Sequence, residues 1–222
     1  MFDKLPISSK TEKILTKSLD EPISAEDANY LINIKGSDLY PLLATADYLR
    51  QEIAGNNVTF INNCNINFTN ICTVRCGFCA FGKDADDPEA YILDDEAILK
   101  KAQGAVDKGA HEFCVMGGVL PDADVEYYEH LLQLLKGEFP NIMIHGFSPT
   151  MIKDASVVSG ISVEDAFERL KSAGLDTLPG TAAEILTDRS REIICPEKVT
   201  TQEWIDIVKT AHEVGIPGSA TI

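Results

Sequence analysis

From residue 94 onward, the chain alternates between helical patterns and short apolar strands. Helical spacing of apolar residues is expected at 94–108, 124–138, 162–173 and 200–215, and strand patterns at 113–116, 142–145, 175–178 and 219–222. Such alternation requires a parallel sheet with right-handed crossovers. We therefore predict an α/β fold, a partial TIM-type (βα) barrel, in which the chain of 222 residues stops in the strand expected as its fifth.

Residues 1–55 are expected to form a helical N-terminal lead-in that precedes the barrel. Ser24 opens a variant of the capping box, and Ser37 is expected to cap a second helix, with Gly55 beyond its end. From residue 58 to residue 68, β-branched and aromatic residues interleave with polar ones, which predicts a strand. The expected domains are therefore residues 1–55 and an incomplete barrel at 56–222.

Three cysteines follow that strand at close spacing. Cys72, Cys76 and Cys79 are separated by three and then two residues, so one turn of the loop brings three thiolates into a small volume. Structural zinc sites and ferredoxin clusters use four ligands, and no fourth cysteine or histidine stands nearby. A cubane cluster on three cysteines leaves one iron open to a further ligand. The alternatives are zinc with a distant fourth ligand, or cysteines that bind no metal.

Composition narrows the classes of partner. The net charge is −16, which argues against nucleic acid or an anionic membrane surface as the main partner, because both require a basic patch. The chain shows neither a long apolar run nor an N-terminal secretion signal, so a cytoplasmic protein is expected. Six cysteines in that compartment are expected to be ligands or buried thiols; Cys64, Cys114 and Cys195 are interpreted as small hydrophobic residues.

Candidate site residues follow from the rule that active residues lie at the carboxyl ends of parallel strands. These ends present the cysteine loop, Gly117 and Gly118, residues 145–148, and residues 179–184, which are expected to face a common mouth. Paired glycines allow the backbone to approach a ligand closely, although such pairs also occur in ordinary turns. Glu184 is either a charge at a helix start or a ligand contact.

The histidines differ in position. His145 ends a predicted strand at the expected mouth, where it would hydrogen-bond a polar substrate or transfer a proton, unless it is a satisfied core residue. The others are interpreted as surface or packing residues: His111, His130 and His212.

The cysteine spacing, with aromatic Phe78 before the last cysteine, resembles the radical S-adenosylmethionine (SAM) superfamily. The resemblance implies a 4Fe-4S cluster on Cys72, Cys76 and Cys79, with SAM on the open iron. It further implies that Phe78 lies near the adenine and that Gly117 and Gly118 contact the methionine amino group. Glu184 would contact cofactor or substrate.

Further runs resemble the family formed by the second subunits of FO synthase, which helps to make a deazaflavin chromophore. The matching segments are 65–70, 79–81, 87–91, 147–149, 173–186 and 194–198. The futalosine-route enzymes of menaquinone biosynthesis share the earlier segments and tend to differ at residues 181–183. They remain the alternative within the catalytic interpretation.

The resemblance implies a concrete reaction. Hydrogen is abstracted from L-tyrosine, the tyrosine Cα–Cβ bond breaks, and the 4-hydroxybenzyl group is joined to 5-amino-6-(D-ribitylamino)uracil, leaving 2-iminoacetate. A second radical SAM subunit then closes the deazaflavin ring, and an electron donor is required. His145, Ser148 and Thr181 are the candidate substrate contacts.

Two departures from the family pattern concern substrate recognition. Cys64 stands near a position where relatives carry arginine, and Leu120-Pro121 replaces a His-Pro pair. Because the family's barrel continues further, we expect this chain to be truncated at its C-terminus, with an uncovered sheet edge and a possible loss of activity. Two other classes remain open: an iron–sulfur electron carrier, and an enzyme-derived binding or assembly module.

Overall fold

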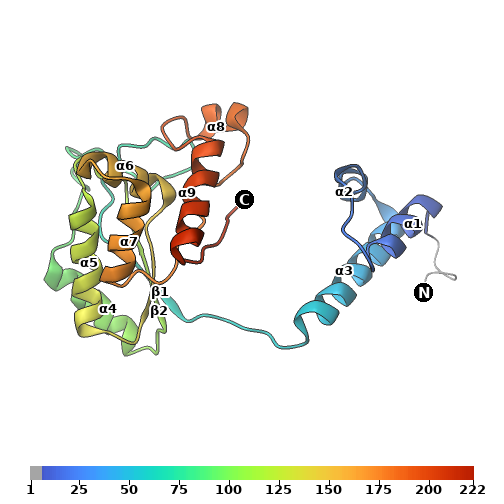
Figure 1. The fold of residues 1–222 in the computed structure, drawn as a ribbon, viewed down its shortest axis with the longest axis horizontal. Helices are drawn as coiled ribbons and strands as arrows, with labels where there is room; N and C mark the ends of the chain where they lie inside the picture. Colours follow the sequence, from blue (N-terminus) through green and yellow to red (C-terminus); the bar gives the residue numbers. More distant parts are fainter. Residues whose placement is uncertain (1–6) are drawn as a thin grey trace. The chain divides into compact units, whose positions relative to one another are not determined.

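A computed structural model describes residues 7–222 and divides the chain into two compact units, one that ends at Phe60 and one that spans Ile61–Ile222 (Figure 1). No helix in the described part of the chain is both long and apolar enough to cross a membrane. The two units are described separately below.

The first unit consists of short helices around a small core. They are α1 (Ser9–Lys17), α2 (Ala25–Ile32), the 3₁₀ turn η1 (Gly36–Asp38) and α3 (Leu39–Ala54). Ile14, Leu15 and Leu31 are buried between them. Ser24 caps α2 by accepting a hydrogen bond from the backbone N–H of Asp27, as predicted, and Gly55 ends α3 with a positive φ.

The predicted cap at Ser37 is wrong. Residues 36–38 form η1, and α3 begins at Leu39 after Asp38, whose side chain makes no capping bond to α3. The Asp38 carboxylate instead accepts hydrogen bonds from the Ser8 and Thr11 hydroxyls, at 2.6 and 2.7 Å. This acidic side chain therefore ties the start of α1 to the start of α3, a contact that the local sequence does not reveal.

The second unit is built on a parallel sheet in the order β1 (Asn63–Asn67), β2 (Glu112–Met116), β3 (Met143–Gly146). Single parallel bridges continue the same order, from His145 to Thr177 and from Leu178 to Gly218. Consecutive parallel neighbours of this kind are those of a (βα) barrel.

The strand expected at 175–178 is reduced to the bridges at Thr177 and Leu178, and the strand expected at 219–222 does not form, because the second bridge falls at Gly218, one residue before it. Pro179 and Pro217 flank the bridge between Leu178 and Gly218, and proline has no N–H to donate to a ladder. The strand expected at 58–68 is also shorter, because pairing starts where Asn63 meets Glu112 at the beginning of β2.

Six helices of this unit accompany the sheet in the part of the chain that the structure describes. They are α4 (Asp95–Val106), α5 (Val125–Glu138), α6 (Pro149–Ser159), α7 (Val163–Ala173), α8 (Asp188–Ile194) and α9 (Thr201–Val214). In Figure 1, α5, α7 and α9 stand beside one another, and both α5 with α7 and α7 with α9 are in contact. The sequence analysis identified α4, α5, α7 and α9, but not α6 or α8.

The two faces of the sheet differ in polarity. Side chains alternate across a strand, so Phe113, Val115 and Ile144 fall on the face that is buried in the main hydrophobic core. The opposite face carries Cys114, which lies in register with Asn65 on one side and His145 on the other. One face therefore packs against the helices, and the other presents a polar row to the barrel interior.

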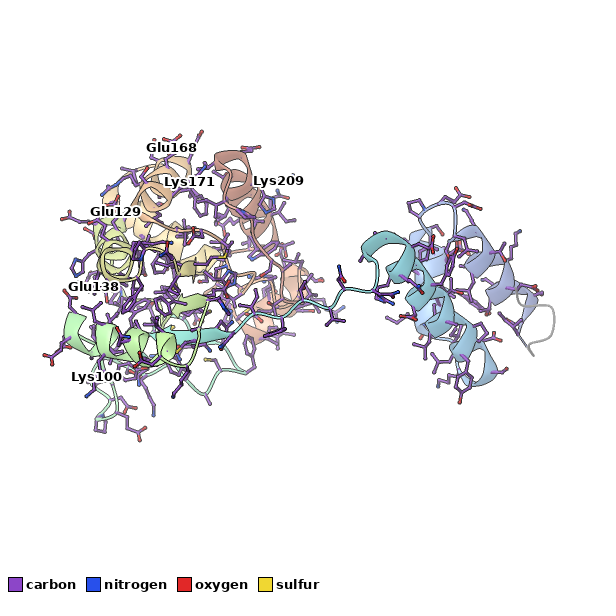
Figure 2. All side chains as sticks on the ribbon, turned by 90° about the horizontal axis from the view of Figure 1, so that it is seen from below. Lys100, Glu129, Glu138, Glu168, Lys171 and Lys209 are labelled. Carbon is purple, nitrogen blue, oxygen red and sulfur yellow. The ribbon has the colours of Figure 1, made fainter. Side chains whose placement is uncertain are left out.

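The outer surface of the helices is charged. Figure 2 labels such side chains on the outside of the helical layer: Lys100 on α4, Glu129 and Glu138 on α5, Glu168 and Lys171 on α7, and Lys209 on α9. Glu129 pairs with Arg169 of α7, and Lys171 donates to the carbonyl of Val214 at the end of α9. These contacts join neighbouring helices at the surface.

Candidate functional site

A pocket of about 130 Å³ lies at the carboxyl ends of β1, β2 and β3. The predicted site residues in its wall are Cys72, Cys76, Phe78, Cys79, Gly117, Gly118, Ser148 and Thr181. The wall also contains residues not singled out from the sequence: Val74, Phe81, Gly82, Met116, Val119, Thr150, Ala182 and Lys198. The structure thus brings four separate strand-end segments to one place, as the barrel topology predicted.

The loop of the three cysteines is hydrogen-bonded to residues far along the chain. The N–H of Cys79 donates to the carbonyl of Cys76 at 3.0 Å, which closes a tight turn. The N–H of Gly77 donates to the carbonyl of Ile194 at 2.7 Å, at the end of α8. The N–H of Arg75 donates to the Glu197 carboxylate at 3.0 Å. The segment after α8 therefore fixes the orientation of the loop.

Cys72 is held against the residue that follows the glycine pair. The N–H of Val119 donates to Sγ of Cys72 at 3.3 Å, and the carbonyl of Val119 accepts from the N–H of Thr73 at 2.9 Å. Backbone N–H groups aimed at sulfur stabilise a thiolate and tune iron–sulfur clusters. The end of β2 thus positions the sulfur of Cys72 and donates a hydrogen bond to it.

The glycine pair is required by close packing of the backbone. A Cβ on Gly118 would lie 2.0 Å from the carbonyl oxygen of Ile71, and one on Gly117 would lie 3.0 Å from the Phe68 ring. Neither glycine has the positive φ that would itself require glycine. We conclude that their small size lets the cysteine loop lie directly on the end of β2.

The pKa of Cys76 lies above its ordinary value, because the effect of burial outweighs that of a nearby cation. Burial raises the pKa of the Cys76 thiol, the ammonium of Lys198 lowers it, and the neighbouring sulfurs of Cys195, Cys79 and Cys72 raise it further. Lys198 therefore opposes the effect of burial and favours the thiolate, the form in which a cysteine can bind a metal.

Lys198 comes from the segment after α8, and the spacing of the sequence gave no indication that it would reach the pocket. Its Nζ lies 2.5 Å from a carboxylate oxygen of Glu184 and 5.4 Å from the centre of the Phe78 ring. Glu184 itself is absent from the pocket wall, in contrast to the expectation of direct ligand contact. The reason is local, because its carboxylate is held by Lys198 and by the N–H of Ala182.

Arg191 of α8 lies buried behind the same wall. Its guanidinium donates to the carbonyl oxygens of Ala182 and Ala183 at 2.8 and 2.7 Å, and to that of Val199 at 3.1 Å. Ala182 and Glu184 both adopt positive φ, which costs free energy in residues other than glycine. The buried arginine satisfies the carbonyls of this strained turn and joins it to the residue after Lys198.

Three hydroxyl side chains contribute to the wall. Ser148 caps α6 by accepting from the N–H of Met151 at 3.3 Å. The hydroxyl oxygens of Thr150 and Thr181 are buried, and neither has a hydrogen-bond partner in the part of the chain that the structure describes. A buried hydroxyl without a partner is costly, and both belong to the pocket wall. Thr150 was missed by the sequence analysis, since it lies inside a helix that was not predicted.

His145 lies outside this pocket. Its Nδ1 is 2.6 Å from the hydroxyl of Thr177, and the strand register places it beside Cys114 on the interior face of the sheet. Burial lowers the pKa of His145, and Glu112 opposes this shift. The residue therefore belongs to the polar row with Asn65, separate from the cysteine pocket.

The cysteine spacing and the strand-end position of the pocket correspond to a known family. The family model of the radical SAM superfamily matches residues 66–222. The chain belongs to the radical SAM superfamily.

Two relatives within this superfamily are similar to the chain over most of its length. The 5-amino-6-(D-ribitylamino)uracil–L-tyrosine 4-hydroxyphenyl transferase of Methanothermobacter thermautotrophicus is 48% identical over 216 residues, covering 97% of this chain and 59% of that protein. The enzyme of the same name from Nostoc sp. is 43% identical over 210 residues, covering 92% of this chain and 54% of that protein. The chain thus spans little more than half the length of these relatives.

Solved structures agree on the fold. The FeFe-hydrogenase maturase HydG from Carboxydothermus hydrogenoformans superposes with a TM-score of 0.73 at 20% identity, over 93% of this chain and 46% of that one. Methylornithine synthase (PylB) superposes with a TM-score of 0.66 at 19% identity, over 95% of this chain and 57% of that one. The predicted α/β class and partial radical SAM barrel are confirmed.

Radical SAM proteins generally use SAM and a 4Fe-4S cluster, and the pocket can be tested against both. Its wall supplies three cysteine thiols and no other histidine, cysteine or carboxylate. Within residues 7–222, no three such side chains gather as they would around one metal ion. A four-iron cluster distributes its ligands over separate irons, so ligands need not converge on one point. The donor set and the two unpartnered hydroxyls fit a cluster with a polar ligand beside it.

Proposed function

We propose that this chain carries the cluster and SAM site of a radical SAM transferase that joins the 4-hydroxybenzyl group of L-tyrosine to 5-amino-6-(D-ribitylamino)uracil. The observation that carries the proposal is the gathering of Cys72, Cys76 and Cys79 in one strand-end pocket with Gly117 and Gly118. It is supported by relatives of that name at 48 and 43% identity. The ring-closing subunit of FO synthase and an electron donor are the proposed partners.

The proposed roles follow the positions of the side chains. Cys72, Cys76 and Cys79 would hold the cluster, which together with SAM supplies the one-electron chemistry of the reaction. Phe78, whose ring is half exposed beside Lys198, offers an aromatic face to the adenine.

We propose that the hydroxyl side chains and the residues of the interior row contact the ligands and do not hold the cluster. Ser148 and Thr181 would orient polar groups within the pocket, and Glu184 would act on the ligand through Lys198. His145, with Thr177 as its partner, would contact substrate from the barrel interior. Ser148, Glu184 and His145 are each held by a neighbour, so these side chains would be preorganised before a ligand enters, whereas the Thr181 hydroxyl is left without a partner.

The test is an anaerobic assay of the reconstituted chain with SAM, a reductant, L-tyrosine and the diaminouracil. The expected products are 5′-deoxyadenosine and the 4-hydroxybenzyl adduct of the uracil, each dependent on tyrosine. Formation of neither product by protein that carries its cluster and binds SAM would reject the transferase proposal. A product formed only from a futalosine-route substrate would favour the menaquinone enzymes instead.

Cysteine variants test the cluster assignment independently of turnover. Cys76→Ala is expected to abolish incorporation of the four-iron cluster, measured as iron and sulfide per chain and by electron paramagnetic resonance. Cys114→Ala is the matched control, because this cysteine is also partly buried but lies on the interior face of β2. Equal iron content in Cys76→Ala and the control would contradict the assignment.

A further inference from the structure

A fourth cysteine, Cys195, lies beside the cysteine loop. It directly follows α8, is only 1% exposed, and is absent from the wall of the pocket that the loop lines. Its backbone is held on both sides, because its N–H donates to the carbonyl of Arg191 at 2.8 Å and its carbonyl accepts from the N–H of Lys198 at 3.1 Å. The Cys195 thiol is therefore enclosed by protein at a defined position.

Cys76 and Cys195 flank one backbone hydrogen bond. The N–H of Gly77 belongs to the peptide bond after Cys76, and the carbonyl of Ile194, 2.7 Å away, belongs to the peptide bond before Cys195. In antiparallel ladders, residues that flank a bond in this way form the close, non-hydrogen-bonded pairs, with Cα atoms about 4.5 Å apart. Disulfides span Cα distances of about 4.4–6.8 Å. The connectivity of this hydrogen bond thus favours a disulfide between the two cysteines.

The electrostatics of the site also indicate that the two sulfurs are neighbours. Burial is the main reason why the pKa of the Cys76 thiol is raised. Among the neighbouring thiols, Cys195 has a larger effect on this pKa than Cys79, which belongs to the same loop as Cys76. Such effects weaken with distance and with exposure to water. Cys195 is therefore the thiol that interacts most strongly with Cys76.

The two cysteines differ in their access to solutes. Cys76 is partly exposed and belongs to the pocket wall, whereas Cys195 is buried and does not. A pocket of about 130 Å³ is large enough for a molecule of the size of hydrogen peroxide. A cluster on the cysteine loop would bind the Cys76 sulfur to iron. An oxidant that enters after the cluster is lost would therefore meet Cys76 first, with Cys195 behind it.

We propose that Cys76 and Cys195 form a reversible disulfide when the chain does not hold its cluster. Hydrogen peroxide oxidises the Cys76 thiolate to a sulfenic acid, and its O–O bond breaks to release hydroxide. The sulfur of Cys195 then attacks the sulfenic sulfur, the S–O bond breaks, and the oxygen leaves as water with the Cys195 proton. Two thiols thus lose two electrons to one peroxide. Cys195 is the resolving cysteine of this site.

The disulfide has two consequences for the cluster site. Cys76 cannot bind iron until a thiol reductant has opened the bond, so rebuilding of the cluster waits for reducing conditions. Oxidation also stops at a reversible step, because a sulfenic acid without a thiol partner proceeds to the irreversible sulfinic acid. Cys195 would thereby preserve Cys76 through a period of oxidation.

Disulfide mapping tests the proposal. Reconstituted protein is stripped of iron with a chelator under anaerobic conditions and treated with an equimolar amount of hydrogen peroxide. Free thiols are then alkylated, and a tryptic digest is analysed by mass spectrometry without reduction. Trypsin places Cys76 in the peptide 76–83 and Cys195 in the peptide 192–198. These two peptides are expected to be joined, with fragmentation placing the bond at Cys76. Protein that keeps its iron and is not oxidised should yield both peptides alkylated.

Two variants make the result specific. Cys195→Ala is expected to lose the joined peptides and to accumulate sulfinic acid at Cys76. Cys114→Ala is the matched control, because this cysteine is also partly buried but lies on the interior face of β2. It should form the disulfide as the unmodified chain does. After reduction with dithiothreitol, the unmodified chain and the control should take up iron and sulfide again, whereas Cys195→Ala should not.

The iron content of each variant before oxidation shows whether it folds and loads. If Cys195→Ala fails to load, the mapping of the unmodified chain decides alone. A disulfide within the peptide 76–83, or one that joins 192–198 through Cys79, would overturn the pairing. Recovery of Cys195 as a fully alkylated thiol from protein in which Cys76 has been oxidised would overturn it as well. These measurements use neither SAM nor substrate, so their failure is distinct from a failure of the transferase proposal.

Discussion

The backbone N–H of Gly77 donates a 2.7 Å hydrogen bond to the carbonyl oxygen of Ile194. This bond joins the middle of the cysteine loop to the end of α8, and the bond from Arg75 to Glu197 reinforces it. The bond between Gly77 and Ile194 joins two backbone groups, so no side-chain substitution removes it directly. The side chain of Glu197 is the part of this fastening that mutation can remove.

Glu197→Ala is expected to loosen the cysteine loop. The loss of one hydrogen bond to an exposed carboxylate costs at most about 1 kcal/mol, so reconstituted protein should release iron to a chelator up to several-fold faster. The measurement is the rate of iron release under anaerobic conditions. Glu192→Ala, at an exposed position on α8, serves as control. Unchanged release from Glu197→Ala would show that the loop does not depend on this bond.

Gly118→Ala is expected to destabilise the second unit by about 1–3 kcal/mol or more, because the new Cβ would lie 2.0 Å from the Ile71 carbonyl. Urea unfolding followed by far-UV circular dichroism measures the effect. Gly104→Ala is the matched control, since nothing lies within 4 Å of its Cβ and it stands inside α4. The control should gain about 0.5–1 kcal/mol. Equal stability of the two variants would contradict the packing role of Gly118.

Arg191→Met is expected to cost about 2–4 kcal/mol, because it leaves the carbonyls of Ala182, Ala183 and Val199 without their donor. The same urea titration measures this loss. Arg189→Met, exposed on the same helix, should lie within about 0.5 kcal/mol of the unmodified chain. A neutral result for Arg191→Met would mean that the turn at 182–184 holds its positive φ values without this guanidinium.

We expect the free energy of unfolding to depend on pH through the ionisation of His145. Burial lowers its pKa below the ordinary value of 6.5, so on acidification the unfolded chain takes up the proton first. The contribution of His145 to the free energy of unfolding is therefore fully present above about pH 6.5. It is lost as the pH falls towards the pKa that His145 has in the folded chain. The slope is at most about 1.4 kcal/mol per pH unit.

His145→Asn keeps a polar partner for Thr177 but cannot titrate, so the free energy of unfolding should fall less steeply with acid than in the unmodified chain. Urea titrations between about pH 5 and pH 7 measure both slopes. His111→Asn, at an exposed position, is the control and should retain the original slope. Parallel profiles for His145→Asn and the unmodified chain would exclude this histidine as the source.

The features that could be predicted from the sequence are those with a local pattern of residue types or spacing. Alternation of helix and strand predicts the parallel order of β1, β2 and β3, and the cysteine spacing predicts the loop that lines the pocket. Helix α6 was not predicted, although Ser148 and Pro149 are typical of a helix start and Gly160 of a helix end.

Long-range contacts were not predictable in this way. Lys198 enters the pocket because α8 turns the chain back towards the cysteine loop, and Arg191 is buried because three carbonyls surround it. Neither position has a local pattern that distinguishes it from a surface charge. His145 was placed at the expected mouth by its strand-end position, yet side-chain alternation directs it to the interior row with Cys114.

The fastening of the cysteine loop also sets an order of assembly during synthesis. A nascent chain that has emerged as far as α7 already contains Cys72, Cys76 and Cys79, but not the carbonyl of Ile194 or the carboxylate of Glu197 that hold their loop. The cysteine loop can therefore acquire these two restraints only after the chain has been synthesised through Glu197.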